Sequence, residues 1–469
     1  MRRVHAFGDD ALGDLDALGL SEAIRAGWVG RAEVIEAAIA RTEAVNPALN
    51  GLAYNAFEQA RATASANPSS AFFSGVPTFL KDNVDVAGQP TMRGADAWEP
   101  RNAVADGEFT RAYLATGPTS LGKTQMSEFG FSAAAEHPRL GPVRNPWDTD
   151  YTAAASSSGS GAFVAAGVVP IAHANDGGGS IRIPAACNGI VGLKPSRGRL
   201  PLDAELRRMP VGIVTNGVLT RSVRDTAAFY REAERIWRNP KLAPIGDVTG
   251  PGRQRLRIAV ATGSLRRECG QEMRDLTLKS AGVLEELGHR VEHIDQHPVP
   301  DSFVDDFILY WGFLALMQVR MGRREFGKTF DRTRLDALTL GLERHTAHNL
   351  YRLPGVIMRL RRMRRRSAEF YQTYDALLTP TLADPTPRVG YLAPTDYQQL
   401  MDRLIDWVAF TPLQNVTGDP AISLPLAQSA EGMPVGMMLA ADLGQEALLL
   451  ELAYELEEAR PRARIQAAG

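Results

Sequence analysis

Three side chains spread over a hundred residues have the types needed to cleave an amide. Lys81 follows the apolar run GVPTFL and directly precedes the turn-forming pair Asp82-Asn83. Its apolar flanks would desolvate the ammonium group, lower its pKa and let the neutral amine act as a base. Ser156 and Ser180 lie further along in segments rich in serine and glycine. A serine hydroxyl is a nucleophile that such a base can activate.

The segment directly before Ser180 offers backbone groups for an oxyanion. In NDGGGSIRIP, Asp176 and the glycines Gly177, Gly178 and Gly179 precede the serine. Glycines leave their N–H groups unobstructed, and such N–H groups stabilise the charge that develops during acyl transfer. A serine- and glycine-rich cluster taken alone is more often a loop, so the prediction depends on its combination with Lys81.

Two other patterns compete and are rejected on their context. GPTSLGKT, residues 117–124, satisfies the phosphate-loop pattern. However, a helix-like FTRAYLATG precedes it and SLGKT itself is strand-like, which reverses the strand-to-helix order that a phosphate loop requires. The same stretch holds Ser120-x-x-Lys123, but on a strand these two side chains would not share the required face.

No metal or thiol chemistry is predicted. His345 and His348 stand three residues apart, but no carboxylate-rich partner motif accompanies them. Cys187 and Cys269 are the two cysteines, without metal-ligand spacing and without a histidine in a partnering motif. We therefore expect two buried thiols in a reducing compartment, and we assign no metal and no cofactor.

The chain divides into an N-terminal helical layer, residues 1–67, and an α/β body, residues 68–469. Apolar positions at helical spacing run from residue 14 to 46, where Asn46-Pro47 supplies a stop. Beyond residue 72, short apolar strands alternate with helices and glycine-rich turns, which favours an α/β fold. Residues 301–375 are predicted to be mainly helical.

The composition excludes several classes of protein. The chain has 469 residues and a formal net charge of -2, which offers no overall field for nucleic acid or an anionic membrane. The basic run RLRRMRRRS at 359–367 is therefore interpreted as a solvated helix face. No stretch reaches the roughly 18 apolar residues of a spanning helix, and no apolar run follows the N-terminal arginines, so we expect a cytoplasmic protein.

These residues resemble the amidase signature family, in particular amidases of the actinobacterial type, over most of the chain. The family's glycine- and serine-rich signature is similar to AASSSGS from residue 154 and to DGGGSIRIP from residue 176. LGKTQMSEFGF, GPVRNPWDTDYT, GVLTRSVRDTA and FTPLQNVTGDPAISLP resemble further family segments. Ala154 and Ala155 depart from the pattern, because the family usually has glycines there.

The resemblance implies a mixed central β-sheet flanked by helices on both faces. It also implies that Ser180 is the nucleophile and that Ser156, held by a cis peptide, passes its proton to a neutral Lys81. Gly177, Gly178 and Gly179 then form the oxyanion hole, and no cofactor is needed. For Ser157, Asp176 and Arg182 we expect a supporting role, with Ser157 and Asp176 orienting the loop and Arg182 pairing with a carboxylate such as Asp176.

The predicted function is hydrolysis of a small acyl or aryl amide through a seryl acyl-enzyme, as in EC 3.5.1.4. Two alternatives stay open: an amidotransferase-type subunit that feeds ammonia to a charged tRNA, and a catalytically silent binding protein with the same fold. The family resemblance also suggests a homodimer. Residues 301–375 are expected to line the pocket, although the spacing of Tyr310, Trp311 and Phe313 is more typical of a helix core.

Overall fold

A mixed eight-stranded sheet is central to the fold in this computed structural model, which describes residues 2–66, 69–264, 267–295, 299–393 and 395–467. Along the sheet the strand order is β10-β9-β11-β13-β12-β7-β8-β6. The strands are β6 (Ile171–Asp176), β7 (Val191–Lys194), β8 (Thr215–Thr220), β9 (Arg257–Val260), β10 (Arg290–His293), β11 (Ala376–Pro380), β12 (Ala421–Gln428) and β13 (Pro434–Ala440). Only β10 with β9 and β9 with β11 pair in parallel among these strands, so the sheet is mixed, as predicted.

A smaller sheet abuts the edge strand β6. It has the order β1-β3-β2, formed by β1 (Leu52–Asn55), β2 (Pro77–Lys81) and β3 (Thr119–Thr124). Thr78 of β2 donates its hydroxyl to the carbonyl of Ile171 at 2.9 Å, and the backbone N–H of Lys81 donates to His173 at 3.2 Å. The ends of β2 and β6 are thereby held side by side, which brings Lys81 close to the residues that follow β6.

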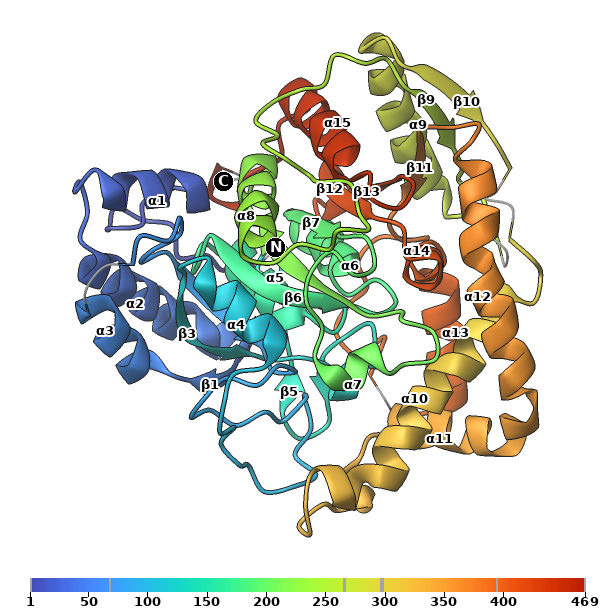
Figure 1. Cartoon of the computed structure of the whole chain (residues 1–469), viewed down its shortest axis with the longest axis horizontal. Helices are drawn as coiled ribbons and strands as arrows, with labels where there is room; N and C mark the ends of the chain where they lie inside the picture. The colour runs from blue at the N-terminus through green and yellow to red at the C-terminus, as the bar shows by residue number, and fades with distance from the viewer. Residues whose placement is uncertain (1, 67–68, 265–266, 296–298, 394, 468–469) are drawn as a thin grey trace.

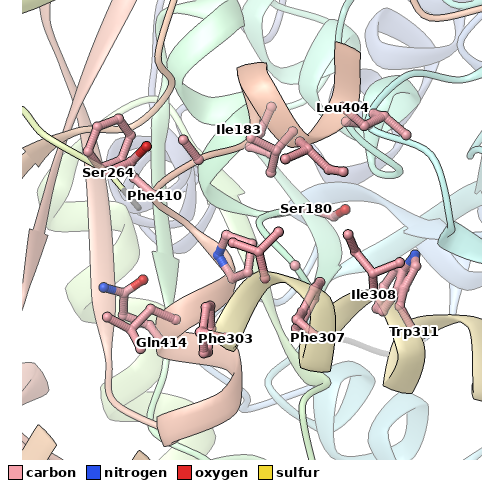
Figure 2. A pocket seen from close by; sticks show the side chains of 18 of the residues that line it. Ser180, Ile183, Ser264, Phe303, Phe307, Ile308, Trp311, Leu404, Phe410 and Gln414 are labelled. Atoms are coloured by element: carbon pink, nitrogen blue, oxygen red, sulfur yellow. The ribbon is translucent and has the colours of Figure 1, made fainter. Parts of the chain in front are cut away.

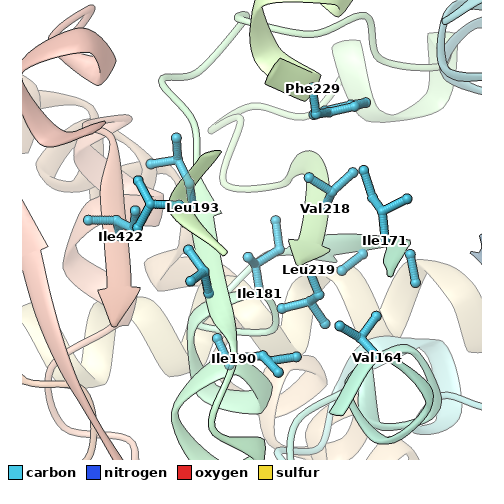
Figure 3. Close-up of a cluster of buried hydrophobic side chains, with 14 of the residues drawn as sticks. Val164, Ile171, Ile181, Ile190, Leu193, Val218, Leu219, Phe229 and Ile422 are labelled. Atoms are coloured by element: carbon cyan, nitrogen blue, oxygen red, sulfur yellow. The ribbon is translucent and has the colours of Figure 1, made fainter. Parts of the chain in front are cut away.

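Helices cover both faces of the central sheet. Val218 and Leu219 are neighbours on β8 and therefore point to opposite faces. Figure 3 shows Phe229 of α8 (Val223–Ile236) on the side of Val218 and Val164 of α5 (Ser158–Ala165) on the side of Leu219. All four side chains are buried, so each face of the sheet contributes to the hydrophobic core.

The helix α6 (Arg182–Asn188) lies unusually close to the sheet because two glycines lie beneath it. A Cβ atom at Gly192 of β7 would lie 2.7 Å from the Cβ of Ala185, and one at Gly436 of β13 would lie 2.5 Å from that of Ala186. Both distances are too short for real atoms, so the backbone of α6 sits where side chains would otherwise be. The position of Ser180, two residues before α6, depends on this approach.

The N-terminal layer consists of α1 (Ala17–Arg25), α2 (Arg31–Leu49) and α3 (Phe57–Ser65). The prediction that Asn46-Pro47 ends the second helix is wrong, because Pro47 lies inside the last turn of α2. The helix ends instead at Leu49, where Asn50 takes a left-handed φ of 55°. The predicted boundary between residues 67 and 68 lies outside the described residues.

Three long helices fill the segment 301–375, as predicted: α10 (Phe303–Glu325), α11 (Ala337–Asn349) and α12 (Leu353–Phe370). Together with α13 (Tyr397–Trp407) they form one side of the molecule, away from α1, α2 and α3 (Figure 1). The basic run 359–367 lies on α12, where Arg359 pairs with Asp306 and Arg364 with Asp419 and Asp442. Part of its charge is thus neutralised within the fold.

The remaining elements connect these layers. They are α4 (Glu108–Ala115), β4 (Glu136–His137), β5 (Gly141–Pro142), α7 (Ala204–Arg207), α9 (Gln271–Glu286), α14 (Pro412–Thr417), α15 (Glu446–Ala459) and the short 3₁₀ turns η1 (Glu128–Gly130), η2 (Arg332–Arg334), η3 (Leu350–Arg352) and η4 (Ile465–Ala467). The order α4 then β3 confirms that GPTSLGKT follows a helix and enters a strand. It is therefore not a phosphate loop.

We predict that Gly192→Ala lowers the free energy of unfolding by roughly 1–3 kcal/mol, because the added methyl group overpacks the contact between β7 and α6. Urea unfolding followed by circular dichroism measures the change. Gly282→Ala is the matched control: a Cβ at Gly282 in α9 would meet nothing within 4 Å. That variant should gain up to about 1 kcal/mol from helix propensity. Equal effects of the two substitutions would contradict the packing argument.

Candidate active site

The amine of Lys81 is completely buried at the end of β2, with three oxygen partners. Its Nζ lies 2.6 Å from Ser156 Oγ, 2.9 Å from Ser157 Oγ and 2.5 Å from Asn175 Oδ1. The side chain of Lys81 has a relative exposure of 0%. No carboxylate oxygen of a described residue lies within 4.0 Å of this nitrogen. The three partners are uncharged, so the ammonium form of Lys81 has no adjacent counter-charge.

This environment favours the neutral amine. Burial lowers the pKa of Lys81 well below its ordinary value of 10.5, and the more distant charge of Asp176 opposes that shift only in part. Loss of water disfavours the charged form of any buried amine, whereas a neutral amine keeps both its hydrogen bonds and its basicity. The desolvation predicted from the apolar flanks of Lys81 is thus present in the fold.

His173 supports Lys81 from the β6 side. Its Nδ1 accepts the backbone N–H of Lys81, and its Nε2 lies 3.4 Å from Asn216 Oδ1. Burial lowers the pKa of His173 to about 3, so the ring is neutral in the folded protein. A neutral ring can accept a hydrogen bond at Nδ1 while Nε2 carries its proton. His173 therefore positions the backbone that carries the base.

Ser156 and Ser157 directly precede α5, and the chain reaches them through two residues of left-handed conformation. Ala154 and Ala155 have φ angles of 62° and 55°, at the two positions where the family pattern has glycine. The expected cis peptide at Ser156 is wrong for this structure, because all described peptide bonds are trans. The chain direction changes through the φ angles of the two alanines instead, and Ser156 Oγ still faces Lys81.

Ser180 lies between β6 and α6, next to Ser156. Its Oγ accepts the backbone N–H of Ser156 at 3.2 Å. Within the described residues the two hydroxyl groups share no direct hydrogen bond, although both belong to the same cluster. Ser180 is 9% exposed and lines a cavity, whereas Lys81 is fully buried and is not among the residues that line this cavity. The hydroxyl that a bound molecule would meet is therefore that of Ser180.

A buried ion pair fixes the loop that carries Ser180. Arg182 binds Asp176 through two parallel hydrogen bonds of 3.0 and 2.9 Å, and both side chains are fully buried. Asn415 completes the network by donating to Asp176 Oδ1 at 2.8 Å. Burial alone would raise the pKa of Asp176, but the charge and hydrogen bonds of Arg182 outweigh burial and leave it lowered. Arg182 thus pairs with Asp176, as the sequence led us to expect.

The backbone N–H groups of the glycine loop are not equivalent. Gly179 donates its N–H to Asp176 Oδ1 at 2.7 Å, so this group is already engaged. The N–H groups of Gly177 and Gly178 have no hydrogen-bond partner among the described residues. Gly179 also has a φ of 136°, and a Cβ there would lie 2.4 Å from Thr411 Oγ1, so that only glycine fits. We therefore see Gly179 as part of the scaffold and Gly177 and Gly178 as free donors.

The cavity in front of Ser180 has a volume of about 160 Å³ and is mainly apolar. Phe303, Phe307 and Trp311 of α10 line one side of it (Figure 2). The sequence left open whether Tyr310, Trp311 and Phe313 form an aromatic wall or belong to the core, and Trp311 lines the cavity. Tyr310 is indeed buried, with its hydroxyl bonded to the carbonyl of Val211 at 2.8 Å. Helical spacing of four residues places Trp311 on the same face as Phe307 instead.

Lys123 of the rejected phosphate-loop pattern has a structural role. Its Nζ donates to the carbonyl of Pro90 and to Thr91 Oγ1, both at 2.6 Å, and lies 3.7 Å from Asp82 Oδ1. The side chain is buried, so it holds the loop after β2 in place. Ser120 of the same strand forms no bond to Lys123 that would make the pair a nucleophile and a base.

The potential metal ligands in the described parts of the chain are dispersed. No group of three or more His, Cys, Asp or Glu there is arranged to hold a metal ion. Burial raises the pKa of Cys187 to about 12, which disfavours the thiolate nucleophile. Among the described helices, none combines the length and the apolar character that crossing a membrane would require.

Comparison with known proteins assigns the family. The family model described as Amidase matches residues 33–450. The chain belongs to the amidase signature family. It is 80% identical to a protein of Mycobacterium leprae named putative amidase AmiC, over 99% of each chain.

Two solved structures of amidase signature enzymes are close in fold. A 6-aminohexanoate cyclic dimer hydrolase complexed with substrate is 30% identical, with a TM-score of 0.87 over 96% of this chain and 98% of the other. A bacterial aryl acylamidase is 26% identical, with a TM-score of 0.84 over 95% and 96%. The mixed α/β fold and the amidase signature family are therefore both confirmed, and with them a hydrolase acting on amides.

Sequence reasoning overlooked several residues of the site. Asn175 contacts the Lys81 amine, His173 its backbone, and Asn415 the Asp176 carboxylate. The sequence offered one clue to Asn175, since this residue directly precedes Asp176 at the end of a strand. The sequence offered no such clue to His173 and Asn415, because their roles arise from contacts with strands and helices that are far apart in the chain. Ser157, expected to orient the loop, contacts Lys81 directly.

We predict that Asn175→Asp shifts the acidic limb of the pH–activity profile to higher pH and lowers activity near neutrality. A carboxylate 2.5 Å from Nζ would stabilise the ammonium form and raise the pKa of Lys81. The profile of kcat/KM against pH measures the shift. Asn216→Asp is the control, because Asn216 contacts His173 and not Lys81. This variant should move the acidic limb less. An unchanged limb in Asn175→Asp would contradict the assignment of Lys81 as the base.

Proposed function

We propose that this enzyme hydrolyses the carboxamide bond of a small acyl or aryl amide through an acyl-enzyme on Ser180. The observation that carries the proposal is the buried contact chain from Lys81 Nζ to Ser156 Oγ, with the Ser156 backbone in contact with Ser180 Oγ. In this proposal Lys81 is the desolvated amine, Ser156 the relaying hydroxyl and Ser180 the cavity-facing nucleophile of that cluster. The overall reaction yields a carboxylate and ammonia or an amine, as in EC 3.5.1.4.

The hydrogen-bond partners of Lys81 support one direction for the proposed proton relay, in which the lysine amine is neutral. A neutral amine has two N–H donors and one lone pair. Asn175 Oδ1 can only accept, and Ser157 donates its own hydroxyl to the carbonyl of Asn175 at 3.3 Å. Both therefore receive an N–H from Lys81. The lone pair of the amine is left for the hydroxyl of Ser156, and Ser156 Oγ in turn is free to accept the proton of Ser180.

The proposed reaction follows from this polarity. Ser180 Oγ forms a bond to the substrate carbonyl carbon as its proton moves to Ser156 and that of Ser156 moves to Lys81. The carbonyl oxygen becomes an oxyanion, for which the free N–H groups of Gly177 and Gly178 are the donors we propose. When the C–N bond breaks, the relay returns the proton to the leaving nitrogen, and water then hydrolyses the ester on Ser180.

The supporting residues act by holding this geometry. The Asp176–Arg182 pair positions Gly179 and thereby the two free glycine N–H groups, and Ser157 keeps Lys81 in place. Hydrogen bonds in an active site without substrate are often long and tighten only when substrate binds. The lack of a direct hydrogen bond between the hydroxyls of Ser156 and Ser180 is consistent with this behaviour. The two free, buried cysteines support our expectation of a cytoplasmic enzyme.

We predict that a fluorophosphonate forms one covalent adduct on Ser180, detected by intact-mass spectrometry and peptide mapping. The adduct should be absent in Ser180→Ala. It should form at least about 100-fold more slowly in Lys81→Met, because general-base assistance contributes roughly 10²- to 10⁴-fold. Thr110→Val, a buried hydroxyl deletion outside the site, is the control. A folded natural protein that forms no adduct and turns over no amide would favour the silent binding protein.

We predict that kcat/KM for amide hydrolysis in the natural enzyme rises with pH along a limb set by Lys81. The pKa of Lys81 is lowered by burial, so the protonated, inactive form predominates only below that lowered value. Activity should therefore be lost as pH falls through that lowered pKa and retained above it. A pH–rate profile measured with an activated ester as substrate tests the same limb in a reaction that does not expel an amine. A limb near 10.5, the ordinary value for lysine, would contradict a neutral base.

A further inference from the structure

Two buried carboxyl groups meet where the turn η1 contacts the start of α11. Glu128 is the first residue of η1 and Asp336 is the N-cap of α11, and both side chains are buried. The backbone N–H of Asp336 donates to Glu128 Oε1 at 2.9 Å, and the side chains of the two residues are in hydrogen-bonding contact as well. Two carboxyl groups can make such a contact only when one of them carries a proton.

Asp336 is the member of this pair that carries the proton. Burial, followed by the charge of Glu128, raises the pKa of Asp336 to about 8. Two negative charges in contact inside a protein repel one another strongly, so the remaining proton of the pair is released only at a higher pH than usual. Asp336 Oδ1 accepts the N–H of Thr339 at 2.7 Å, so the other oxygen of Asp336 is the one available to carry the proton. At neutral pH the pair therefore has one proton and one negative charge.

The charged groups next to the pair are bound to one another. His137 Nε2 lies 3.6 Å from Glu128 Oε2 and 3.7 Å from Asp96 Oδ1. Asp96 in turn binds Arg139 at 2.6 Å and Arg334 at 2.5 Å. Hydrogen bonds from these two arginines hold the pKa of Asp96 below its ordinary range, so all three groups keep their charges between pH 7 and pH 10. Among the described neighbours, His137 is the one whose titration must be separated from that of the pair.

The segment 128–133 connects the carboxyl pair with the active site. Four of its residues line the cavity in front of the nucleophile. The carbonyl of Ala133 accepts the N–H of Ala155 at 2.5 Å, directly before Ser156 in the chain. A Cβ at Gly130 would lie 3.5 Å from Ser156 Oγ. A shift of this segment would therefore change the surroundings of the proposed relay hydroxyl.

This segment has a backbone conformation that its neighbours must hold. Phe129 has a left-handed φ of 50°, which residues other than glycine rarely adopt and which costs free energy. Such a conformation persists only where surrounding contacts fix it. Glu128 binds the start of α11, and the indole N–H of Trp311 on α10 donates to the carbonyl of Phe131 at 3.2 Å. The two helices lie side by side (Figure 1), and the segment is bound to both of them.

We propose that Glu128 and Asp336 are positioning residues, and that the proton they share holds the segment 128–133 in the conformation that Ser156 and Ser180 need. Loss of that proton at alkaline pH leaves two carboxylates in contact, so η1 and the start of α11 move apart and the acylation of Ser180 slows. This inference rests on the proposed function, because it takes Ser180 as the residue that is acylated. It adds an alkaline limit to the acidic limit that we expect from the lysine base.

The first experiment measures the second-order rate constant for labelling of Ser180 by a fluorophosphonate between pH 6 and pH 10, with intact-mass spectrometry. This measurement does not require the natural substrate. The natural protein should be labelled at least about 10-fold more slowly at pH 10 than at pH 7, because the protonated fraction falls about tenfold for each pH unit above the pKa. Equal rate constants at pH 7 and pH 10, in a protein that circular dichroism shows to be folded at both, would overturn the inference.

Asp336→Asn removes the titrating proton and keeps the hydrogen bonds. The amide can donate an N–H to Glu128 at every pH, and its oxygen can accept the N–H of Thr339. The labelling rate constant of this variant should change less than about threefold between pH 7 and pH 10, because an amide does not titrate. His137→Gln should keep the alkaline fall, since His137 contacts Glu128 but does not carry the shared proton. An alkaline fall that remains in Asp336→Asn, or that disappears in His137→Gln, would overturn the role of the pair.

Asp396→Asn is the matched control variant. Asp396 caps α13 as Asp336 caps α11, and each carboxyl group accepts a backbone N–H of its own helix at 2.7 Å. Asp396 is exposed, so water stabilises its charge at every pH in the range. This variant should keep the full alkaline fall of the natural protein. Loss of the fall in both variants would indicate a general effect of helix capping and would overturn the specific role of the pair.

Hydrogen exchange measures the movement itself, and in the natural protein it does not depend on whether any variant folds. The backbone N–H groups of the segment 128–133 should lose protection between pH 7 and pH 9, after correction for the intrinsic exchange rate, whereas those of β6 should not. In Asp336→Asn the segment should stay protected. Unchanged protection of the segment in the natural protein would overturn the proposed movement.

The labelling experiment also separates failure of the inference from failure of the proposed function. An adduct on Ser180 that forms equally fast at neutral and alkaline pH would leave the hydrolase in place and refute the role of the carboxyl pair. A folded protein that forms no adduct at any pH and hydrolyses no amide would refute the proposed function, and the inference with it.

Discussion

The burial of one amine without a counter-charge is the constraint on which the rest of the site depends. Lys81 is fully buried and has three uncharged oxygen partners, so the neutral amine is favoured where an exposed lysine would be charged. An ammonium ion could not accept a proton. A carboxylate in contact with Nζ would restore the charge, but the nearby carboxylate of Asp176 is paired with Arg182.

The buried ion pair and the neutral base are therefore complementary. Arg182 neutralises Asp176, and Asp176 uses its remaining lone pairs to bind the N–H groups of Gly179 and Ile181. A buried pair of this kind is weak evidence for stability, because desolvation offsets much of the attraction. Its structural effect is specific, since it determines which glycine N–H groups are engaged and which remain free. The loop geometry around Ser180 follows from that division.

The central sheet and the helical segment contribute different parts of the enzyme. The ends of β2 and β6 and the start of α6 supply the reacting groups, and glycines under α6 allow it to lie close to the sheet. The helices α10 and α13 supply the cavity walls, with side chains that have no part in proton transfer. A family with one reacting cluster can thus accept different amides when the residues of these helices differ.

The amino-acid sequence by itself determined the family, the α/β fold class, and Lys81, Ser156 and Ser180 as the candidate reacting groups. These three residues can be recognised because the features that mark them, namely apolar flanks, glycines and neighbouring serines, lie close to them in the sequence. It also predicted the helical segment 301–375 and the helix-then-strand order that excludes a phosphate loop. The left-handed conformation of Ala154 and Ala155 was not predicted, because the sequence showed only that alanines stand where the family pattern has glycines. The cis peptide expected at Ser156 is not present in the structure.

Only the tertiary structure decided which partners these groups have. Asn175 and His173 reach Lys81 because β2 lies against β6, and Asn415 reaches Asp176 across more than two hundred residues of sequence. The position of Trp311 on the cavity wall likewise follows from packing between distant elements. Spacing along the chain carries no information about such contacts, because strand order and helix packing are set by the burial of the whole core.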